Sequence, residues 1–457
     1  MLTVEKIGGT SMSALKEVIE NIILYNRTGE QLYNRIFVVS AFSGVTNQLL
    51  ENKKTKAPGI YHKLANNQDY LEAVKSVTVY LKELNQRYQQ LGLDVADADG
   101  FIEAHVAKAL IYLESATTML ASGYLNEGVL LAAREILASI GETHSAYVLA
   151  NILQNRGLKA ILVDLSGFDD RRPMTINERI KDAFKEIDLK NCICIVTGYA
   201  KGTEGIMREF DRGYSEVTFS KIAEILKPQE AIIHKEYHLS TADPGLVGID
   251  NVQPVGNTNY DIADQLADVG MEAIHPKAAK PLEMAGIHLR IKNTFEPAHP
   301  GTLITRGYIS ALKRVEVITG ADQLLMIDIY DPLMVGNVGS DLQIMQLFFN
   351  HGVSYTFKTT SANSITIVVW ESDFKQELVN DLQKSFEKVT TELVAMVCLL
   401  GTNMDQPGLL AKAATALANS DINIISTGVA KGKVNIQFLI SREQFKTAII
   451  ALNKAVG

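Results

Sequence analysis

The chain has 457 residues, of which 47% are hydrophobic and 21% are charged, a composition typical of globular proteins. A net charge of −8 argues against a nucleic-acid partner, and no apolar run is long enough for a membrane helix. The first residues lack the basic start and apolar stretch of a signal peptide, so we expect a cytoplasmic protein. The three cysteines lie in apolar runs and are expected to be reduced core residues.

The chain begins with a strand, a glycine turn and a helical pattern. Residues 2–7 predict a short strand, residues 8–11 a turn and residues 14–25 a helix. Lys6 lies at the end of the strand, beside two glycines whose missing Cβ atoms let backbone N–H groups approach a ligand. A cation beside a helix N-terminus suits a phosphate group, and a purely structural turn is the alternative.

Further short apolar runs predict buried strands, and they alternate with helical patterns that include most of residues 60–155. These runs are residues 36–41, 160–165, 192–197 and 231–234. Strands that alternate with helices predict an α/β fold with a mostly parallel sheet and helices on both faces. Ligands bind such sheets at the carboxyl ends of the strands, so we expect the functional loops to follow the strands.

The last third of the chain contains an internal repeat. Gly339 precedes a helical pattern at 342–349, and Gly408 precedes one at 409–418 at the same offsets. Short alternating runs flank both patterns, which predicts two βαββαβ units after the larger α/β domain. Two small modules that are alike by chance are the alternative.

Three further loops carry groups suited to chemistry. Residues 40–47 offer hydroxyls, and Glu142 is expected just past a helix, with a C-cap glycine and a solvated acid as the alternative. Residues 210–218 form a turn before a helix at 218–226, and Arg212 in this turn can hold a carboxylate with two hydrogen bonds. A surface ion pair is the alternative here. Together the loops favour phosphoryl transfer, which needs positioning and charge neutralisation rather than a covalent nucleophile.

A series of motifs in the same order resembles aspartate kinase, a member of the amino-acid kinase family with two C-terminal ACT domains. The motifs are residues 6–12, 38–41 with 46–47, 141–142, 241–244, 274–276, and 292–295 with 301–302. The resemblance implies a catalytic domain at 1–306, with a mostly helical segment at 50–155, and ACT-like domains at 316–388 and 394–457. It also implies phosphorylation of L-aspartate by Mg-ATP to 4-phospho-L-aspartate, with Mg²⁺ carried by the nucleotide and no metal site of the protein's own.

The resemblance assigns roles to individual residues. As catalytic residues it implies Lys6, Arg212 and Glu216. The substrate-binding residues would be Thr46, Glu142, Arg212 and Ser215. The nucleotide-binding residues would be Lys6, Gly8, Gly9, Thr10, Ser40, His234, Lys235, Ser240 and Asp243. An amino-acid effector would contact Gly339, Thr356 and Ser361, and a homodimer or higher homo-oligomer is expected.

The chain departs from the family pattern at several positions. Tyr214 adds bulk, Glu216 replaces a common aspartate, and Gly245 stands where a basic residue is usual. Residues 211–216 also resemble the aspartate kinases associated with ectoine synthesis. Two alternatives stay open: a kinase for another amino acid such as glutamate, and a catalytically weak amino-acid sensor.

Overall fold

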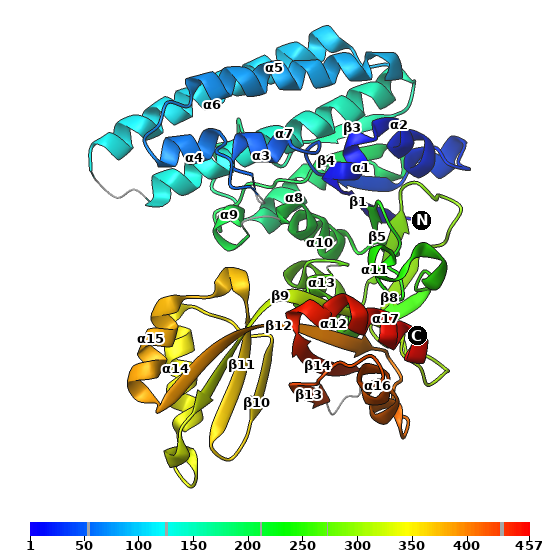
Figure 1. Ribbon diagram of the computed structural model, residues 1–457. Helices are drawn as coiled ribbons and strands as arrows, with labels where there is room; N and C mark the ends of the chain where they lie inside the picture. Colours follow the sequence, from blue (N-terminus) through cyan, green and yellow to red (C-terminus); the bar gives the residue numbers. More distant parts are fainter. Residues whose placement is uncertain (53–54, 124–126, 211–212, 272, 430–433) are drawn as a thin grey trace. The chain divides into compact units, whose positions relative to one another are not determined.

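The computed structural model describes residues 1–52, 55–123, 127–210, 213–271, 273–429 and 434–457, which form two compact units (Figure 1). The first unit comprises Met1–His238 and Ile274–Thr305, and the second comprises Leu239–Ala273 and Arg306–Gly457.

A mostly parallel sheet forms the centre of the first unit, which confirms the predicted fold class. Within this unit the strand order is β3-β4-β2-β1-β5-β7-β8, and only the β7–β8 pair is antiparallel. The strands are β1 Thr3–Ile7, β2 Arg35–Val39, β3 Ala160–Val163, β4 Ile193–Thr197, β5 Glu230–Lys235, β7 His288–Asn293 and β8 Thr302–Thr305.

Helices cover this sheet, and three long helices are stacked on one part of it (Figure 1). Helix α7 packs on β2, β3 and β4, α6 packs on α7, and α5 packs on α6. Helix α10 packs on β1 and β2. The helices are α1 Gly9–Ser13, α2 Leu15–Glu17, α3 Val45–Leu49, α4 Ile60–Ala65, α5 Leu71–Tyr88, α6 Val95–Ala121, α7 Glu127–Asn155, α8 Ile176–Phe184, α9 Ile206–Glu209, α10 Tyr214–Leu226 and α13 Pro276–Met284.

Three predicted helix boundaries are corrected. Helix α7 continues to Asn155, so Glu142 lies inside it and not past its end; the apolar face at 146–153 is buried and extends the helix. Helix α10 begins at Tyr214 rather than at residue 218, because Gly213 has a φ of 86° and starts the helix there. The predicted helix at 14–25 is a short α-helical turn followed by a π-helical segment, Val18–Ile23.

The second unit contains an antiparallel sheet with the order β10-β11-β9-β12-β14-β13. Its elements are α11 Pro244–Val247, β6 Asn257–Asn259, α12 Tyr260–Asp268, β9 Val317–Tyr330, α14 Ser340–His351, β10 Phe357–Thr360, β11 Ser364–Trp370, α15 Gln376–Ser385, β12 Lys388–Leu400, α16 Leu409–Ala418, β13 Ser426–Val429, β14 Asn435–Ser441 and α17 Phe445–Val456. The long strands β9 and β12 pair along most of their lengths, with a register shift between Val394 and Met396. The two repeats therefore share one continuous sheet.

The repeat helices begin in the same way, as the sequence predicts. Gly339 precedes α14 with a φ of 105°, and Gly408 precedes α16 with a φ of 85°. Residues with a Cβ atom are strained in this conformation, so glycine at both positions has a physical reason. One core contains side chains of α14 and α15, and a second contains side chains of α16 and α17.

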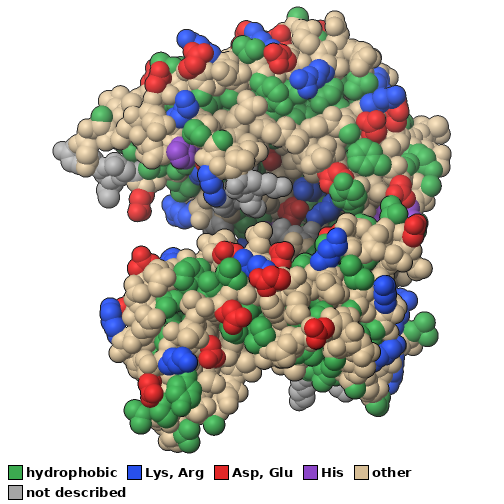
Figure 2. Space-filling model, in the orientation of Figure 1, with side chains coloured by type: hydrophobic (Ala, Val, Ile, Leu, Met, Phe, Trp, Pro, Cys, Tyr) green, Lys and Arg blue, Asp and Glu red, His purple; other side chains and the backbone are tan. Residues whose placement is uncertain are grey.

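The surface and the cysteines are ordinary for a globular protein. Acidic and basic side chains are interspersed over the face that Figure 2 shows. In the described ranges, no helix has the length and apolar character needed to cross a membrane. All three cysteines are buried and free.

Candidate active site

Several predicted site residues meet at the carboxyl ends of the first unit's parallel strands. Lys6 is the penultimate residue of β1, Ser40 follows β2, and Lys235 ends β5. Parallel strands place such residues along the same edge of the sheet. These candidate residues therefore lie at the sheet edge where the strand pattern predicts the functional loops.

Gly8 and Gly9 lie where β1 passes into α1, and they differ in the space around them. A Cβ atom on Gly9 would lie only 2.7 Å from the carbonyl oxygen of Ala41, so this position requires glycine for packing. At Gly8 the nearest atoms to such a Cβ are 3.8 Å away, and one of them is Nζ of Lys6. The lysine ammonium thus lies beside the backbone of Gly8.

Lys6 forms an ion pair with Glu216 in the first turn of α10. The Nζ–Oε1 distance is 3.2 Å, and both side chains are only 12% exposed. The other carboxylate oxygen of Glu216 accepts a hydrogen bond from the backbone N–H of His275 at 2.7 Å. Burial alone would raise the pKa of Glu216, but Lys6, Lys235 and this N–H lower it below its ordinary value. Glu216 is therefore ionised at neutral pH and holds Lys6 in place.

A chain of hydroxyl groups connects the β2 loop to α7. Ser40 Oγ lies 3.1 Å from Ser215 Oγ, and Ser215 Oγ donates to Glu142 Oε1 at 2.8 Å. Ser145 donates to the carbonyl oxygen of Ser40 at 2.9 Å, which fixes the start of the loop. Three predicted site residues from three separate segments are thus in direct contact.

Glu142 is a buried carboxyl group with one oxygen unused. Its side chain is 2% exposed, and within the described part of the chain Oε2 has no hydrogen-bond partner. Burial raises the pKa of Glu142 to about 8, although Ser215, Lys6 and the backbone N–H of Ala41 act to lower it. Buried polar groups normally have partners, so an unpaired carboxyl oxygen marks a place for a ligand with hydrogen-bond donors. A cationic donor would also favour the ionised form.

Gly198, after β4, makes room for this carboxyl group. A Cβ atom at this position would lie 2.5 Å from Glu142 Oε2 and 2.8 Å from the Cβ of Ser215. The sequence interpretation missed Gly198, although its place directly after a predicted strand was a usable signal. His275, whose backbone N–H bonds Glu216, was also missed as a site residue, although its motif was noted.

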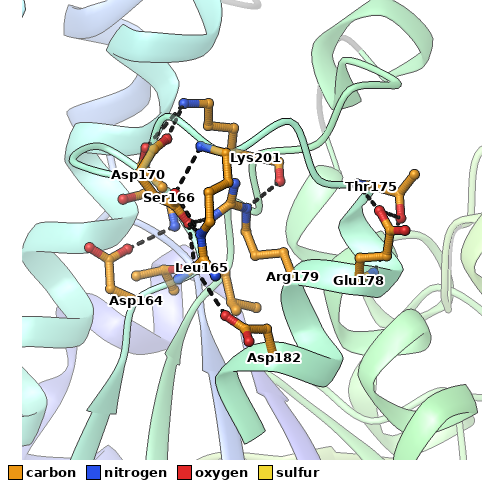
Figure 3. A network of polar contacts seen from close by, with 12 residues as sticks. Asp164, Leu165, Ser166, Asp170, Thr175, Glu178, Arg179, Asp182 and Lys201 are labelled. Atoms are coloured by element: carbon orange, nitrogen blue, oxygen red, sulfur yellow. Dashed lines mark hydrogen bonds and ion pairs between the residues drawn. The ribbon is translucent and has the colours of Figure 1, made fainter.

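A polar network fixes the loop that Gly198 begins to the loop after β3 (Figure 3). Arg179 on α8 donates to Asp170 at 3.0 Å and to the carbonyl oxygen of Lys201 at 2.7 Å. The Lys201 ammonium donates to the carbonyl oxygens of Gly167 and Asp170 at 3.2 and 2.8 Å. These bonds hold both loops at the carboxyl ends of β3 and β4.

The bulky side chain of Tyr214 is buried beside Tyr199. Tyr214 is 3% exposed, and its ring contacts that of Tyr199 at a centroid distance of 6.0 Å. Tyr199 in turn donates to Glu135 at 2.6 Å. Ser215 and Glu216 can therefore reach the site from the first turn of α10 although Tyr214 replaces a small residue.

His234 does not join this group of residues. Its imidazole is buried on the other side of the sheet, where Nε2 lies 2.8 Å from Glu5 Oε2. Successive side chains of a strand point to opposite faces, so His234 and Lys235 diverge. The expected nucleotide contact of the His234 side chain is not supported, whereas Lys235 lies near enough to Glu216 to lower its pKa.

The remaining predicted substrate- and nucleotide-binding residues lie in different segments of the chain. Thr46 lies half-buried in α3. Arg212 lies outside the described residues. Ser240 and Asp243 belong to the second unit, where Asp243 caps α11 by accepting from the N–H of Gly245 at 2.7 Å. Their roles toward nucleotide and substrate stay predictions.

The predicted effector residues lie in the second unit. Gly339 starts α14, Thr356 precedes β10, and Ser361 follows β10. Beside them Lys358 forms an ion pair with Asp341 in the first turn of α14, with an Nζ–Oδ2 distance of 2.7 Å. Among the described residues of the chain, no group of three or more His, Cys, Asp or Glu side chains is arranged to hold a metal ion.

The chain is similar in sequence to known proteins. The sequence profile of the amino acid kinase family matches residues 1–293, and that of an ACT domain matches residues 397–456. The aspartate kinase Ask_Ect of Stutzerimonas stutzeri is 42% identical over all of this chain and 97% of its own length. Chloroplastic aspartokinase 1 of Arabidopsis thaliana is 25% identical over 99% of this chain and 79% of its own.

Solved structures share the fold at lower sequence identity. Aspartate kinase of Clostridium acetobutylicum has a TM-score of 0.74 and 21% identity, with all of both chains covered. Aspartokinase III of E. coli, in complex with aspartate and ADP, has a TM-score of 0.74 and 18% identity, covering 100% of this chain and 99% of its own.

Proposed function

The chain belongs to the amino acid kinase family and, within it, to the aspartate kinases, and we propose that its substrates are L-aspartate and Mg-ATP. The reaction would transfer the γ-phosphoryl group to the β-carboxylate of aspartate and give 4-phospho-L-aspartate and ADP. This assignment agrees with the resemblance that the sequence motifs indicate.

The observation that supports aspartate as acceptor is the unpaired Oε2 of Glu142. An amino-acid ammonium bound there would donate to this oxygen and restore the charge of the carboxylate. Ser215, which donates to the other oxygen of Glu142, would keep the carboxylate oriented. Arg212 would then take the α-carboxylate, as the family resemblance implies.

Lys6 supports the phosphate side of the reaction. Its ammonium lies beside the Gly8–Gly9 turn and is held there by Glu216. Negative charge on the phosphoryl oxygens would be neutralised at this point, which is the main requirement of phosphoryl transfer. The β-carboxylate is already ionised at neutral pH, so the reaction needs no strong general base.

Mg²⁺ would enter with the nucleotide and supply further charge neutralisation at its phosphates. Glu216, which pairs with Lys6, would help to hold this ion. Residues 40 and 46 would border the same space, with Ser40 toward the phosphates and Thr46 toward aspartate.

We further place the chain in the branch associated with ectoine synthesis. The motif at 211–216 supports this, as does 42% identity to the relative named Ask_Ect. An amino-acid effector in the second unit, at Gly339, Thr356 and Ser361, and a symmetric homo-oligomer remain part of the proposal. Light scattering that shows a monomer at micromolar concentration would contradict the oligomer.

A coupled assay of ADP release tests the function and its alternatives. Release that depends on L-aspartate and not on L-glutamate supports the aspartate kinase. Release with glutamate alone would indicate the other amino-acid kinase. Binding of an amino acid without any ADP release would indicate the sensor.

A further inference from the structure

A cavity on the Glu5 side of the first unit's sheet is not used by the proposed reaction. Its volume is about 680 Å³. Side chains of β1, β2, β5 and β7 form its floor, and residues 21–31 with Pro297 and Pro300 form its walls. Because strand side chains alternate, Glu5 and His234 face this cavity while the next residues, Lys6 and Lys235, face the other side.

The floor of the cavity is a buried charged cluster that is internally satisfied. Glu5 accepts from Arg35 Nε at 2.8 Å and Nη2 at 3.1 Å, and it contacts His234 Nε2 at 2.8 Å. An ionised carboxylate only accepts hydrogen bonds, so Nε2 of His234 carries the proton. Arg35 also donates to the carbonyl oxygens of Ile22 and Ile23 at the end of the π-helical segment, at 2.9 Å each.

Two cations at the cavity, Arg27 and Lys292, differ from Arg35 because neither has a carboxylate partner in the described ranges. Arg27 donates only to the carbonyl oxygens of Ile22 and Tyr25, at 3.2 and 3.4 Å. Lys292 donates to the carbonyl oxygen of Pro297 at 3.4 Å. Burial and then a neighbouring cation lower the pKa of both groups, and the charge of Glu5 opposes this lowering only in part.

A third cation, Arg290, does not add to this excess, because it is paired with Glu230 at 2.6 Å. With the floor cluster also paired, Arg27 and Lys292 leave the cavity with surplus positive charge. Partly buried cations that repel each other are stabilised by an anion placed between them. The walls meanwhile offer apolar surface from Ile22, Tyr25 and Pro297.

We propose that this cavity binds a small organic anion, whose phosphate or carboxylate group contacts Arg27 and Lys292 while its apolar part packs against the walls. Its volume lies within the roughly 300–1,000 Å³ range of small-molecule sites. The site is separate from the proposed kinase site, and the binding does not depend on the proposed reaction.

Calorimetric titration of the full-length protein with phenyl phosphate and, separately, with benzoate tests this site. Both probes combine an anionic group with an apolar ring, and they differ in the anion. Mg-ADP and L-aspartate are present at saturation so that the kinase site is filled. The binding of Mg-ADP and L-aspartate is measured first. If neither compound binds, the proposed function is in question. The probe titrations are then repeated on the Lys6→Ala variant, in which the proposed phosphate site is removed.

The decisive comparison uses two double variants with the same change in charge. Arg27→Gln with Lys292→Gln should weaken probe binding at least about tenfold, because charged hydrogen bonds to the anion are lost. Arg87→Gln with Lys181→Gln removes two exposed cations of the same unit and should leave binding unchanged. The site is supported if either probe binds the wild type and the control variant equally and the cavity variant more weakly. The probe that binds shows whether the site prefers a phosphate or a carboxylate.

No binding of either probe to the wild type at about 10 mM would overturn the proposal, since two charge-assisted contacts should exceed this limit. Equal binding by both double variants would overturn it as well. Thermal unfolding checks that the variants fold. Where the cavity double variant does not fold, the single variants Arg27→Gln and Lys292→Gln replace it, and unchanged binding in both would contradict the site.

Discussion

Two buried carboxyl groups in the first unit, Glu5 and Glu142, have nearly the same exposure and opposite electrostatics. Glu5 is 1% exposed and Glu142 is 2% exposed. Arg35 and His234 outweigh the burial of Glu5 and lower its pKa, whereas burial dominates at Glu142 and raises its pKa to about 8. Burial is therefore shared by structural and functional acids, and the unpaired oxygen of Glu142 is what distinguishes the candidate site.

Glu5→Gln should produce the largest effect on stability. It leaves the buried Arg35 without its counter-charge, which costs about 3–5 kcal/mol of unfolding free energy. Because the folded pKa of Glu5 is below its unfolded value, this stabilisation is present above about pH 4.5 and is lost as pH falls through the folded value. Urea unfolding at neutral and acidic pH measures both effects.

The control for this variant is Glu72→Gln, an exposed acid on α5. It should change the stability by less than about 1 kcal/mol, since exposed ion pairs contribute little. A Glu5→Gln protein as stable as the control would show that the Glu5 cluster does not stabilise the fold.

Lys6→Ala should lower kcat roughly 10²- to 10³-fold, equivalent to about 3–4 kcal/mol of transition-state stabilisation. The variant should still fold, because Glu216 loses its ion pair with Lys6 but keeps the hydrogen bond from the backbone N–H of His275. Steady-state kinetics measure the change in kcat, and circular dichroism shows whether the variant is folded. Lys16→Ala on α2 is the matched control, and a folded Lys6→Ala enzyme that retains more than about a third of the wild-type rate would contradict the role.

Glu142→Gln should raise the KM for aspartate about 10- to 100-fold and leave the KM for ATP nearly unchanged, because one charged hydrogen bond to the ammonium is lost. Initial rates at varied aspartate and varied ATP separate the two constants. Equal increases in both constants would place Glu142 away from the amino acid.

The pH dependence of Glu142 is a smaller effect with the opposite sign to that of Glu5. Its folded pKa lies above the unfolded value, so the unliganded protein loses stability as pH rises from about 4.5 through about 8. Aspartate affinity should rise over the upper part of that range, because the ammonium binds the ionised form. Both slopes should be absent in Glu142→Gln; a slope that persists there would assign the titration to another group.

The smallest expected effect is that of lysine on the rate. In the family pattern an acid is common at the position of Thr356, and without it an effector ammonium has no carboxylate there. Asp341, the acid that the structure places nearby, is already paired with Lys358. Titration of L-lysine into the ADP assay should show weak or no inhibition. Half-inhibition below about 1 mM lysine would contradict this prediction, because it requires stronger coupling than a site without that acid can support.

The contrast between the two acids also shows what the sequence could predict. Short apolar runs that alternate with helical patterns predict a parallel sheet, so the loops after the strands, including those at Lys6 and Ser40, were expected along one edge. The order of the strands was not predicted. Glu142 was a candidate from its sequence context, but it was expected beyond a helix end, because glycine before it is typical of a C-cap. In α7 that glycine instead permits close packing, since its Cβ would lie 2.9 Å from the Cβ of Ala41.

The Glu5 cluster could not be predicted, because it joins three strands that are distant in the sequence. The family resemblance implied a nucleotide contact for His234, but strand alternation directs its side chain to Glu5. A shift of one residue along a strand moves a side chain to the opposite face of the sheet. A motif comparison alone does not show which face a given strand residue occupies. The relation of Gly198 to Glu142 likewise depends on packing between β4 and α7.

The most direct test of the central claim is to trap the product with hydroxylamine. An acyl phosphate formed on the β-carboxylate of aspartate reacts with hydroxylamine to give aspartyl hydroxamate, and the phosphate is released. We expect hydroxamate and ADP in equal amounts with L-aspartate, and neither product above background with Lys6→Ala. ADP formed without hydroxamate, or hydroxamate formed from L-glutamate in place of L-aspartate, would contradict the proposed reaction.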